Sequence, residues 1–559
     1  ASASSRADDP VGTLMLIPRW EPLPAASVDK ASTVSGDGWI IVDDDAGRHD
    51  SLRLRYPGAR ILGGMDVGDA SLASRLDALG AFDRLVWLLP ETPGEVSPAS
   101  LVEAQNGGIL RGLALIRALL DLGYGDRTLD LTAITRQCQA VSDGDIVDAT
   151  HAGVWGLVGS AAKEYPRWRV RLVDVKDETS RLAAVGAHVA LPADPDGNGV
   201  AWRDGTWFRE ICLPCELLPP AAPVYRRRGV YVIVGGAGGI GEALTERLIR
   251  EHDARVVWLG RRAADEAIEA SRARLATWGE PPTYLSADAR DVDALREARD
   301  AILSRHGAID GVVHATLVMS GSDLAGMTRE RFVAVTSAKI DTAVLTAHVF
   351  AGYVRDFLVF FSSIQALEKT RRQSNYAAAS TFVDAYAHQL RDGMGCAVKV
   401  IDWGYWGNTG IARELASFQH WLADAGMGSI DPAEGFDALE RLLGSDATRV
   451  AYLKTHRAGA LQGVTLVADC VPHSTTAMPA QPRIVDAPAA TTGTPWLREH
   501  VRQVVLEKLS GLLLIELSDI QPHASFAEYG LDSLQAVATV DAINAALGTR
   551  LTSTSMFDF

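Results

Sequence analysis

Apolar and polar residues alternate along this chain in a pattern that predicts short buried strands separated by helices. Between residues 14 and 222, the apolar runs Trp39–Val42 and Leu85–Leu88 are separated from each other and from later runs by stretches with helical spacing, such as Ser100–Leu120 and His151–Glu164. Strands that alternate with helices of this length are typical of a parallel α/β sheet. We therefore predict an α/β fold for this part of the chain.

The first predicted strand runs into three acidic residues, Asp43, Asp44 and Asp45. A nucleotide site at this point needs glycines and no negative charge, because phosphate must approach the backbone N–H groups at a helix start. We expect residues 14–222 to form a structural, degenerate Rossmann-like subdomain, preceded by a flexible segment over residues 1–13.

A second α/β unit, predicted over residues 223–470, opens with a glycine-rich turn. The turn follows the apolar run Tyr231–Val234 and precedes a helical stretch, Glu242–Arg250. In this order, the backbone N–H groups at the helix start meet the pyrophosphate of a dinucleotide, and glycines permit its close approach. The predicted cofactor residues in the turn are Gly235, Gly236, Gly238, Gly239, Ile240 and Gly241.

The next predicted strand ends in Arg261 and Arg262 instead of an acidic residue. A carboxylate at this point binds the ribose hydroxyls of NAD, whereas paired arginines suit the 2′-phosphate of NADP. The cofactor is therefore predicted to be NADPH, although two solvated arginines would give the same pattern. Asp288 and Ala289, after the following strand, are predicted at the adenine edge.

A serine and a tyrosine follow a later apolar run, Phe357–Phe361. Ser362 and Ser363 follow this run, and Tyr376 lies thirteen residues beyond Ser363. A tyrosine hydroxyl can protonate a carbonyl oxygen when a cation lies beside it and a serine holds that oxygen. Short-chain reductases usually place this cation four residues after the tyrosine, but that residue is Ser380 here. Lys339, on a predicted upstream helix, is the candidate. Each residue alone is more often merely packed or solvated, and it is the combination with the glycine turn that favours catalysis.

With its lysine displaced in this way, the region resembles the ketoreductase domains of modular polyketide synthases, most closely the trans-acyltransferase type. The segments Val154–Gly159, His314–Thr316 and Trp403–Gly407 also carry the resemblance. It implies that Tyr376 is the proton donor and that Ser363 orients the substrate carbonyl. It further implies that Lys339 favours ionisation of the tyrosine and contacts the nicotinamide ribose, and that His314 belongs to the cofactor-binding residues.

Several positions depart from the family pattern. Ser380 stands where an asparagine is usual, and Met319–Gly321 and Glu368 stand where these domains carry markers of product stereochemistry, so no configuration is predicted. The basic residues Lys369, Arg371 and Arg372 precede Tyr376. We hypothesise that they attract an acidic carrier or its phosphopantetheine phosphate.

The C-terminal part of the chain changes in composition. Residues 471–494 are rich in Pro, Ala and Thr and predict a semi-extended linker. In residues 495–559, apolar residues recur at helical spacing around a Gly530–Leu534 motif that contains Ser533. Asp-Ser is also an ordinary helix N-cap. The segment nevertheless resembles an acyl carrier protein without its last helix, which predicts a truncated all-α helical bundle with 4′-phosphopantetheine on Ser533.

Overall composition narrows the class of protein further. A formal net charge of −16 argues against nucleic acid as a partner. No apolar run of transmembrane length and no signal peptide is apparent, so we predict a cytoplasmic protein without membrane contact. The five cysteines include one lone pair, Cys212 and Cys215, for which neutral packing is favoured over metal or redox chemistry. No metal site is predicted.

These observations predict two Rossmann-like halves, structural and catalytic, followed by a small carrier domain. The predicted reaction is reduction of a 3-oxoacyl thioester to the 3-hydroxyacyl thioester with NADPH. The alternatives are a weak or inactive ketoreductase that acts as a docking scaffold, and a short-chain dehydrogenase that acts on a free small metabolite. The partners implied by the resemblance are the carrier-bound substrate, a neighbouring ketosynthase and other synthase modules, a free-standing acyltransferase and a phosphopantetheinyl transferase.

Overall fold

A computed structural model describes most of the two predicted Rossmann-like halves. The described residues are 11–23, 38–64, 71–91, 97–142, 144–177, 180, 184–185, 191–407 and 424–467. The predicted linker over 471–494 and the predicted carrier domain over 495–559, with Ser533, lie outside these residues.

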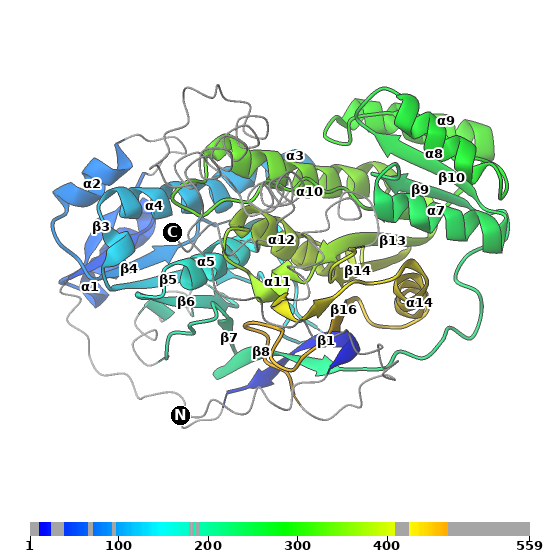
Figure 1. The fold of residues 1–559 in the computed structure, drawn as a ribbon. Helices are drawn as coiled ribbons and strands as arrows, with labels where there is room; N and C mark the ends of the chain where they lie inside the picture. The colour runs from blue at the N-terminus through cyan, green and yellow to red at the C-terminus, as the bar shows by residue number, and fades with distance from the viewer. Residues whose placement is uncertain are drawn as a thin grey trace, which may run out of the picture.

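The first half contains a mostly parallel sheet with helices packed on it (Figure 1). Its strands are β1 (Gly12–Pro22), β2 (Trp39–Val42), β3 (Arg60–Leu62), β4 (Arg84–Leu88), β5 (Leu129–Arg136), β6 (Trp168–Val175), β7 (Gly199–Arg203) and β8 (Thr206–Pro214). Its α-helices are α1 (His49–Arg55), α2 (Leu72–Ala78), α3 (Pro98–Glu103), α4 (Ile109–Asp121) and α5 (Gly153–Glu164), with 3-10 turns at Ala46–Arg48, Ala104–Asn106, Tyr124–Asp126 and Ala149–His151.

The second half repeats the alternation of strands and helices. Its strands are β9 (Val230–Val234), β10 (Arg255–Gly260), β11 (Thr283–Ser286), β12 (Ile309–His314), β13 (Val354–Ser363), β14 (Ala397–Trp403), β15 (Met427–Gly428) and β16 (Arg449–Thr455). Its helices are α7 (Gly239–His252), α8 (Glu266–Leu275), α9 (Val292–His306), α10 (Arg329–Phe350), α11 (Gln365–Glu368), α12 (Ser374–Leu390) and α14 (Pro432–Leu443). The predicted α/β class with two Rossmann-like halves is confirmed.

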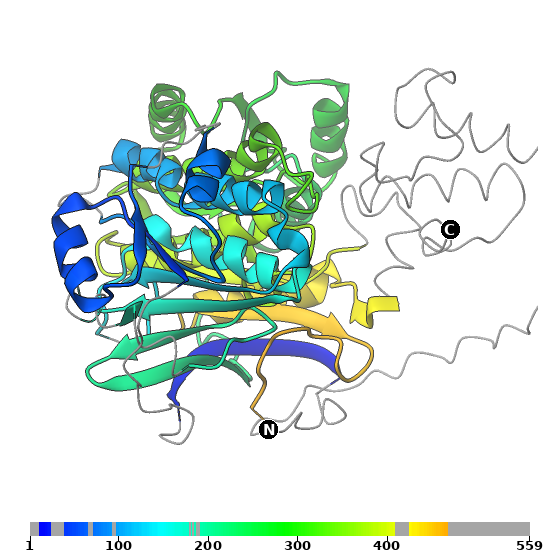
Figure 2. The ribbon, with the colours of Figure 1, turned by 90° about the vertical axis from the view of Figure 1, so that its left-hand side faces the viewer.

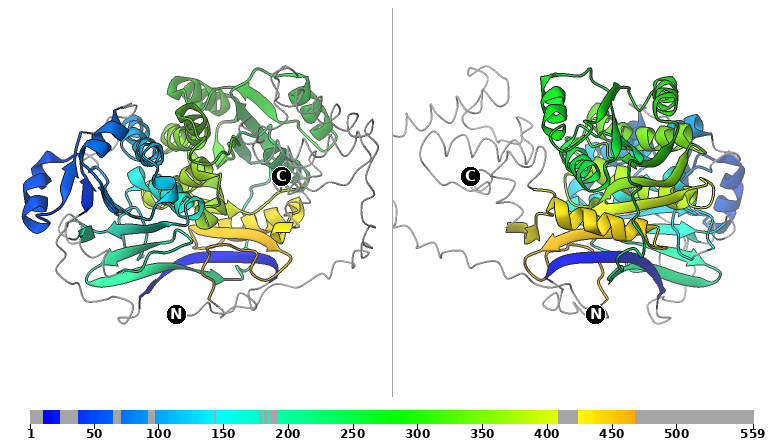
Figure 3. Two further views of the ribbon diagram at one scale, coloured as in Figure 1. Left: turned by 60° about the vertical axis from the view of Figure 1, so that its left-hand side comes forward. Right: turned by 90° about the vertical axis from the view of Figure 1, so that its right-hand side faces the viewer.

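One continuous sheet joins the two halves. Within the described residues its order is β11-β10-β9-β12-β13-β14-β16-β1-β8-β7-β6-β5-β4-β2-β3, with β15 beside β16. Strand β1 is the junction, because Leu16 pairs with Pro214 of β8 on one side and with Ala451 of β16 on the other. Figures 2 and 3 show β1, in dark blue, running beside the orange β16.

A buried ion cluster lies at the same junction. Arg449, at the start of β16, lies 2.9 Å from a carboxylate oxygen of Asp384 on α12 and 2.8 Å from one of Asp402 on β14. It also lies 3.5 Å from Glu210 on β8. Because a buried charge needs partners, the cluster fixes how the two halves meet.

Helix α5 of the first half packs closely against α12 of the second half (Figure 1). A Cβ atom at Gly156 would lie 2.3 Å from the backbone carbon and oxygen of Ala377, and one at Gly159 would lie 2.3 Å from Cδ of Lys369. Glycine is therefore required for this approach. The predicted Val154–Gly159 segment is the surface on which the helix that carries Tyr376 rests.

Helix α10 crosses the core of the second half. By length and composition it could cross a membrane, so the prediction that no apolar run reaches that length is wrong for this helix. Its apolar window is 61% buried inside the protein, and its buried side chains include Phe332 and Phe350. This burial is what a core helix requires.

Candidate active site

A cavity of about 1960 Å³ lies along the carboxyl ends of the parallel strands in the second half. Its lining runs from the glycine turn after β9 to Trp403 at the end of β14, and it also includes residues of the first half such as Lys163. This is the edge at which open α/β sheets bind their ligands.

The glycine turn forms one end of the cavity. Gly235 has a φ of +87°, which favours glycine, and α7 begins directly afterwards at Gly239 with Gly238 as its N-cap. Among the described residues, no side chain caps this helix start with a hydrogen bond, so the turn fits the pyrophosphate of a dinucleotide.

Most predicted cofactor residues of the turn line the cavity, namely Gly235, Gly238, Gly239, Ile240 and Gly241. Gly236 does not line it. A Cβ there would lie 2.2 Å from Cδ1 of Trp258, so Gly236 permits packing of the turn on β10 and is not a wall of the cavity.

The adenine end of the cavity is rich in charge. Arg261 and Arg262 are exposed at the end of β10 and line the cavity, as do Asp288 and Ala289. The hydrogen bonds from Arg290 hold the pKa of the Asp288 carboxyl below its usual range. The exposed guanidinium groups fit a phosphate on the ribose.

His314 lies just behind the wall of the cavity. Its side chain is fully buried and does not line the cavity. Its Nε2 atom lies 2.7 Å from Oγ1 of Thr342 and 2.9 Å from Oγ1 of Thr316, two residues that do line it. Burial lowers the pKa of His314 to about 3, so the ring is neutral. Its assignment to the cofactor-binding residues stays a prediction.

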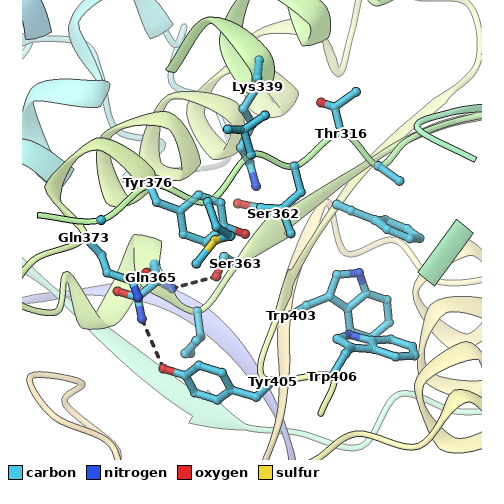
Figure 4. A pocket seen from close by; sticks show the side chains of 18 of the residues that line it. Thr316, Lys339, Ser362, Ser363, Gln365, Gln373, Tyr376, Trp403, Tyr405 and Trp406 are labelled. Carbon is cyan, nitrogen blue, oxygen red and sulfur yellow. Dashed lines mark hydrogen bonds between the residues drawn. The ribbon is translucent and has the colours of Figure 1, made fainter. Parts of the chain in front are cut away.

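The three predicted catalytic residues converge in the middle of the cavity (Figure 4). Lys339 comes from α10, Ser363 from the end of β13, and Tyr376 from the first turn of α12. The Nζ atom of Lys339, a residue only 2% exposed, lies 4.7 Å from the centroid of the Tyr376 ring. The hydroxyl of Ser363 accepts a hydrogen bond of 3.3 Å from the backbone N–H of Gln365. The lysine predicted from a distant helix therefore does stand beside the tyrosine.

Ser380, one turn after Tyr376, does not line the cavity. It is fully buried, and its hydroxyl oxygen has no hydrogen-bond partner among the described residues.

Asn375 was not among the residues predicted from the sequence. Its side chain donates a hydrogen bond of 2.8 Å to the carbonyl of Ser320 and accepts one of 2.8 Å from the N–H of Tyr376. An asparagine next to a tyrosine gives no sequence signal for such a cross-loop contact.

The basic residues before Tyr376 fall into two groups. Lys369 is only 2% exposed, so the hypothesis that it attracts a carrier is wrong. It is buried because α5 covers it, with its Nζ 3.5 Å from Oδ1 of Asn198. Arg371 is exposed and Arg372 half-buried, and both line the cavity.

Glu368 lines the cavity next to these residues and is only 3% exposed. Burial raises the pKa of its carboxyl to about 7, although Lys163 and the N–H of Gln462 act in the opposite direction. This buried acid stands where the resembling domains carry a marker of product stereochemistry.

The cysteine pair is not part of the cavity lining. Cys212 and Cys215 form no disulfide within the described residues, and burial raises the pKa of the Cys212 thiol. Within the described part of the chain, Glu251, His252 and Glu440 bring three possible ligand atoms together, but Arg247 already lies 3.3 Å and 3.0 Å from the two glutamates.

Family matches agree with this arrangement. Residues 229–408 match the KR domain family, and residues 18–209 match the Rossmann fold domain of the polyketide synthase extender module SpnB. Residues 503–559 match the phosphopantetheine attachment site family. Fold and site thus define a Rossmann-fold ketoreductase joined to a phosphopantetheine attachment region.

The chain is also similar in sequence to known polyketide synthases. The chain is 37% identical over 450 residues to polyketide synthase PksN of Bacillus subtilis, an alignment that covers 79% of this chain and 8% of PksN. It is 38% identical over 548 residues to polyketide synthase ThaG of Burkholderia thailandensis, covering 96% of this chain and 9% of ThaG. The chain therefore spans less than a tenth of the length of these relatives.

Two solved structures share the fold. A ketoreductase domain from the bacillaene assembly line superposes with a TM-score of 0.63 at 20% identity, covering 80% of this chain and 98% of that one. An N-terminal ketoreductase from the macrolactin assembly line gives 0.67 at 16% identity, covering 80% and 92%. The chain therefore contains a KR domain and a phosphopantetheine attachment region that are similar to those of polyketide synthases, as predicted, and the relatives agree with the placement near the trans-acyltransferase type.

Proposed function

We propose that this chain reduces a 3-oxoacyl thioester to the 3-hydroxyacyl thioester with NADPH, the substrate being carried on a phosphopantetheine arm at Ser533. The observation that carries the proposal is the convergence of Lys339, Ser363 and Tyr376 at the centre of the cavity that begins at the glycine turn. The ketoreductase family match supports a nicotinamide cofactor in that cavity.

NADPH supplies a hydride to the carbonyl carbon when it is bound. The chain's own residues act on the oxygen. The Ser363 hydroxyl donates a hydrogen bond to the carbonyl oxygen, and the Tyr376 hydroxyl transfers its proton to that oxygen as negative charge develops. Lys339, buried beside the tyrosine ring, stabilises the tyrosinate that remains. One hydride and one proton convert the ketone to the alcohol.

Preference for NADPH over NADH is supported by Arg261 and Arg262. Both guanidinium groups are at the end of β10, beside the region that fits the ribose of the adenosine. A guanidinium can form two parallel hydrogen bonds with a phosphate, which a ribose hydroxyl cannot match.

The proposed partners follow from the carrier region. From Trp496 to Phe559 the chain has eight acidic and four basic residues, so this region has a negative formal net charge. Exposed Arg371 at the cavity mouth is a complementary charge. We place the protein in the cytoplasm, acting with a ketosynthase, other synthase modules, a free-standing acyltransferase and a phosphopantetheinyl transferase.

The test is NADPH oxidation with a 3-oxoacyl N-acetylcysteamine thioester, compared between the unaltered chain and Tyr376→Phe. The variant should lose activity because it lacks the proton donor. Tyr353→Phe is a matched control, since Tyr353 is 44% exposed and does not line the cavity. Equal rates for Tyr376→Phe and the unaltered chain would refute the proposed role of the tyrosine.

Ser380 favours one alternative, a docking scaffold without turnover, because its buried hydroxyl does not reach the cavity. The same assay with substrate loaded on phosphopantetheinylated Ser533 separates the two. No oxidation with either substrate would support the scaffold. Faster turnover of a free ketone than of either thioester would support a dehydrogenase of small metabolites.

A further inference from the structure

The last two residues of α5, Lys163 and Glu164, reach from the structural half into the loops around the cavity. The Nζ atom of Lys163 donates hydrogen bonds to the carbonyl of Glu368 and, at 3.2 Å, to that of Gln462. The Glu164 carboxylate accepts one from the N–H of Arg372 at 2.8 Å and one from the N–H of Leu324 at 2.7 Å. Both oxygens of the carboxylate are therefore used.

These four hydrogen bonds hold three separate loops of the catalytic half. Leu324 belongs to the loop after β12, and Gln462 belongs to the segment after β16. Glu368 is the last residue of α11, and Arg372 lies in the connection from there to α12. All three loops contribute to the wall of the cavity, through Gly321, Gln462 and Arg371 among others. Lys163 itself is only 9% exposed.

The connection between α11 and α12 has a backbone conformation that is unfavourable by itself. Lys369 and Arg372 have φ values of +46° and +65°, in the left-handed region that residues other than glycine rarely adopt. Such conformations persist where the surroundings hold them in place. Lys163 donates its hydrogen bond to the carbonyl of Glu368, just before this connection, and Glu164 accepts one from the N–H of Arg372 near its other end.

The connection leads directly into the first turn of α12, which presents Tyr376. We propose that Lys163 and Glu164 are positioning residues for the reduction: the structural half uses them to hold residues 368–372, and so sets both the position of Tyr376 and the shape of the cavity mouth. The inference rests on the proposed function. It gives the half without a nucleotide-binding turn a direct part in the reaction.

Glu164→Gln is the sharpest test, because the side chain keeps its size but loses one acceptor. The amide can accept from one N–H only, and its NH₂ group then faces the other N–H. We expect kcat/KM for the 3-oxoacyl N-acetylcysteamine thioester to fall by about 10- to 100-fold, since a misplacement of 1 Å has effects of this size. The Kd for NADPH should change less than about twofold, because the glycine turn is remote from these contacts.

A second measurement makes the test independent of activity. Hydrogen exchange of a peptide that contains the Arg372 amide should be faster in Glu164→Gln, because that N–H loses its acceptor. Glu103→Gln, at an exposed glutamate of α3 in the same half, is the matched control and should leave every readout unchanged. Lys163→Met removes the donor at the other end and should reproduce the fall in kcat/KM.

The outcomes separate this inference from the proposed function. Faster exchange at Arg372 with an unchanged kcat/KM would overturn the inference, as would loss of NADPH binding in both Glu164→Gln and Lys163→Met, which would show a merely structural role. Absence of NADPH oxidation by the unaltered chain would instead refute the proposed function. Protection of the Arg372 amide from hydrogen exchange would still show whether this N–H is hydrogen-bonded to Glu164.

Discussion

Substitution of Gly156 by alanine should impair the reaction although the residue lies outside the cavity. The added Cβ would be 2.3 Å from the backbone carbon and oxygen of Ala377, while an ordinary contact begins at 3.4 Å. The obstacle is backbone, which cannot turn away as a flexible side chain does. Helices α5 and α12 must therefore separate by about 1 Å before the methyl group fits.

The expected size of the effect follows from this displacement. Overpacking of a tight interface costs about 1–3 kcal/mol, and alanine in a helix interior returns about 1 kcal/mol relative to glycine. The net loss in the free energy of unfolding is therefore small, at most about 2 kcal/mol. The rate should suffer more, because Tyr376 precedes Ala377 and moves with it, and a shift of about 1 Å can lower kcat about 100-fold.

The assay compares kcat for the N-acetylcysteamine thioester with the free energy of unfolding in urea. Gly144→Ala serves as the control, since nothing lies within 4 Å of a Cβ at that position. A Gly156→Ala variant with kcat within about threefold of the unaltered chain would refute the view that α5 sets the position of Tyr376, since about 100-fold is expected.

Three further predictions concern charge. Replacement of both Arg261 and Arg262 by alanine should raise the Kd for NADPH about 10- to 100-fold and leave that for NADH nearly unchanged in fluorescence titrations. Both side chains are exposed, so their phosphate contacts together are expected to contribute about 1.5–3 kcal/mol, the size of one charged hydrogen bond. A parallel rise for NADH would contradict the phosphate-binding role. Burial raises the pKa of Glu368 from 4.5 to about 7, so its contribution to stability is full below pH 4.5 and is lost as pH rises through 7. Glu368→Gln should therefore remove a pH-dependent loss of up to about 3 kcal/mol between pH 5 and 8, measured by urea unfolding, and an unchanged pH profile would argue against it. Arg449→Met should cost about 3–5 kcal/mol because it leaves buried Asp384 without its cation, and an unchanged urea midpoint would exclude this role for Arg449.

The sequence predicted those parts of the site that depend on residues close to one another along the chain. The glycine turn after β9 and the spacing of Ser363 and Tyr376 depend on neighbours along the chain, and the structure places them in one cavity. Lys339 could be proposed only because position 380 holds a serine, and the structure brings the lysine to the tyrosine from another helix.

The parts that were missed depend on packing between distant segments. The burial of His314 behind the cavity wall depends on its contact with Thr342 on α10, which no local pattern indicates. The burial of Lys369 follows from the close approach of Gly159 on the other half of the protein. The Glu164 contacts join residues more than a hundred positions apart, as with Leu324, 160 residues away.

Strand β1 has a consequence for the order in which the protein can be made. Its residue Gly12 pairs with Thr455, which follows 443 positions later. At about 5–20 residues per second, a ribosome needs roughly 20–90 s to supply that partner. Until then one edge of β1 offers unpaired N–H and C=O groups to any other strand nearby. Strand β1 is thus completed only when β16 has been synthesised, and a nascent chain that stops short of β16 keeps an open edge in the middle of its sheet.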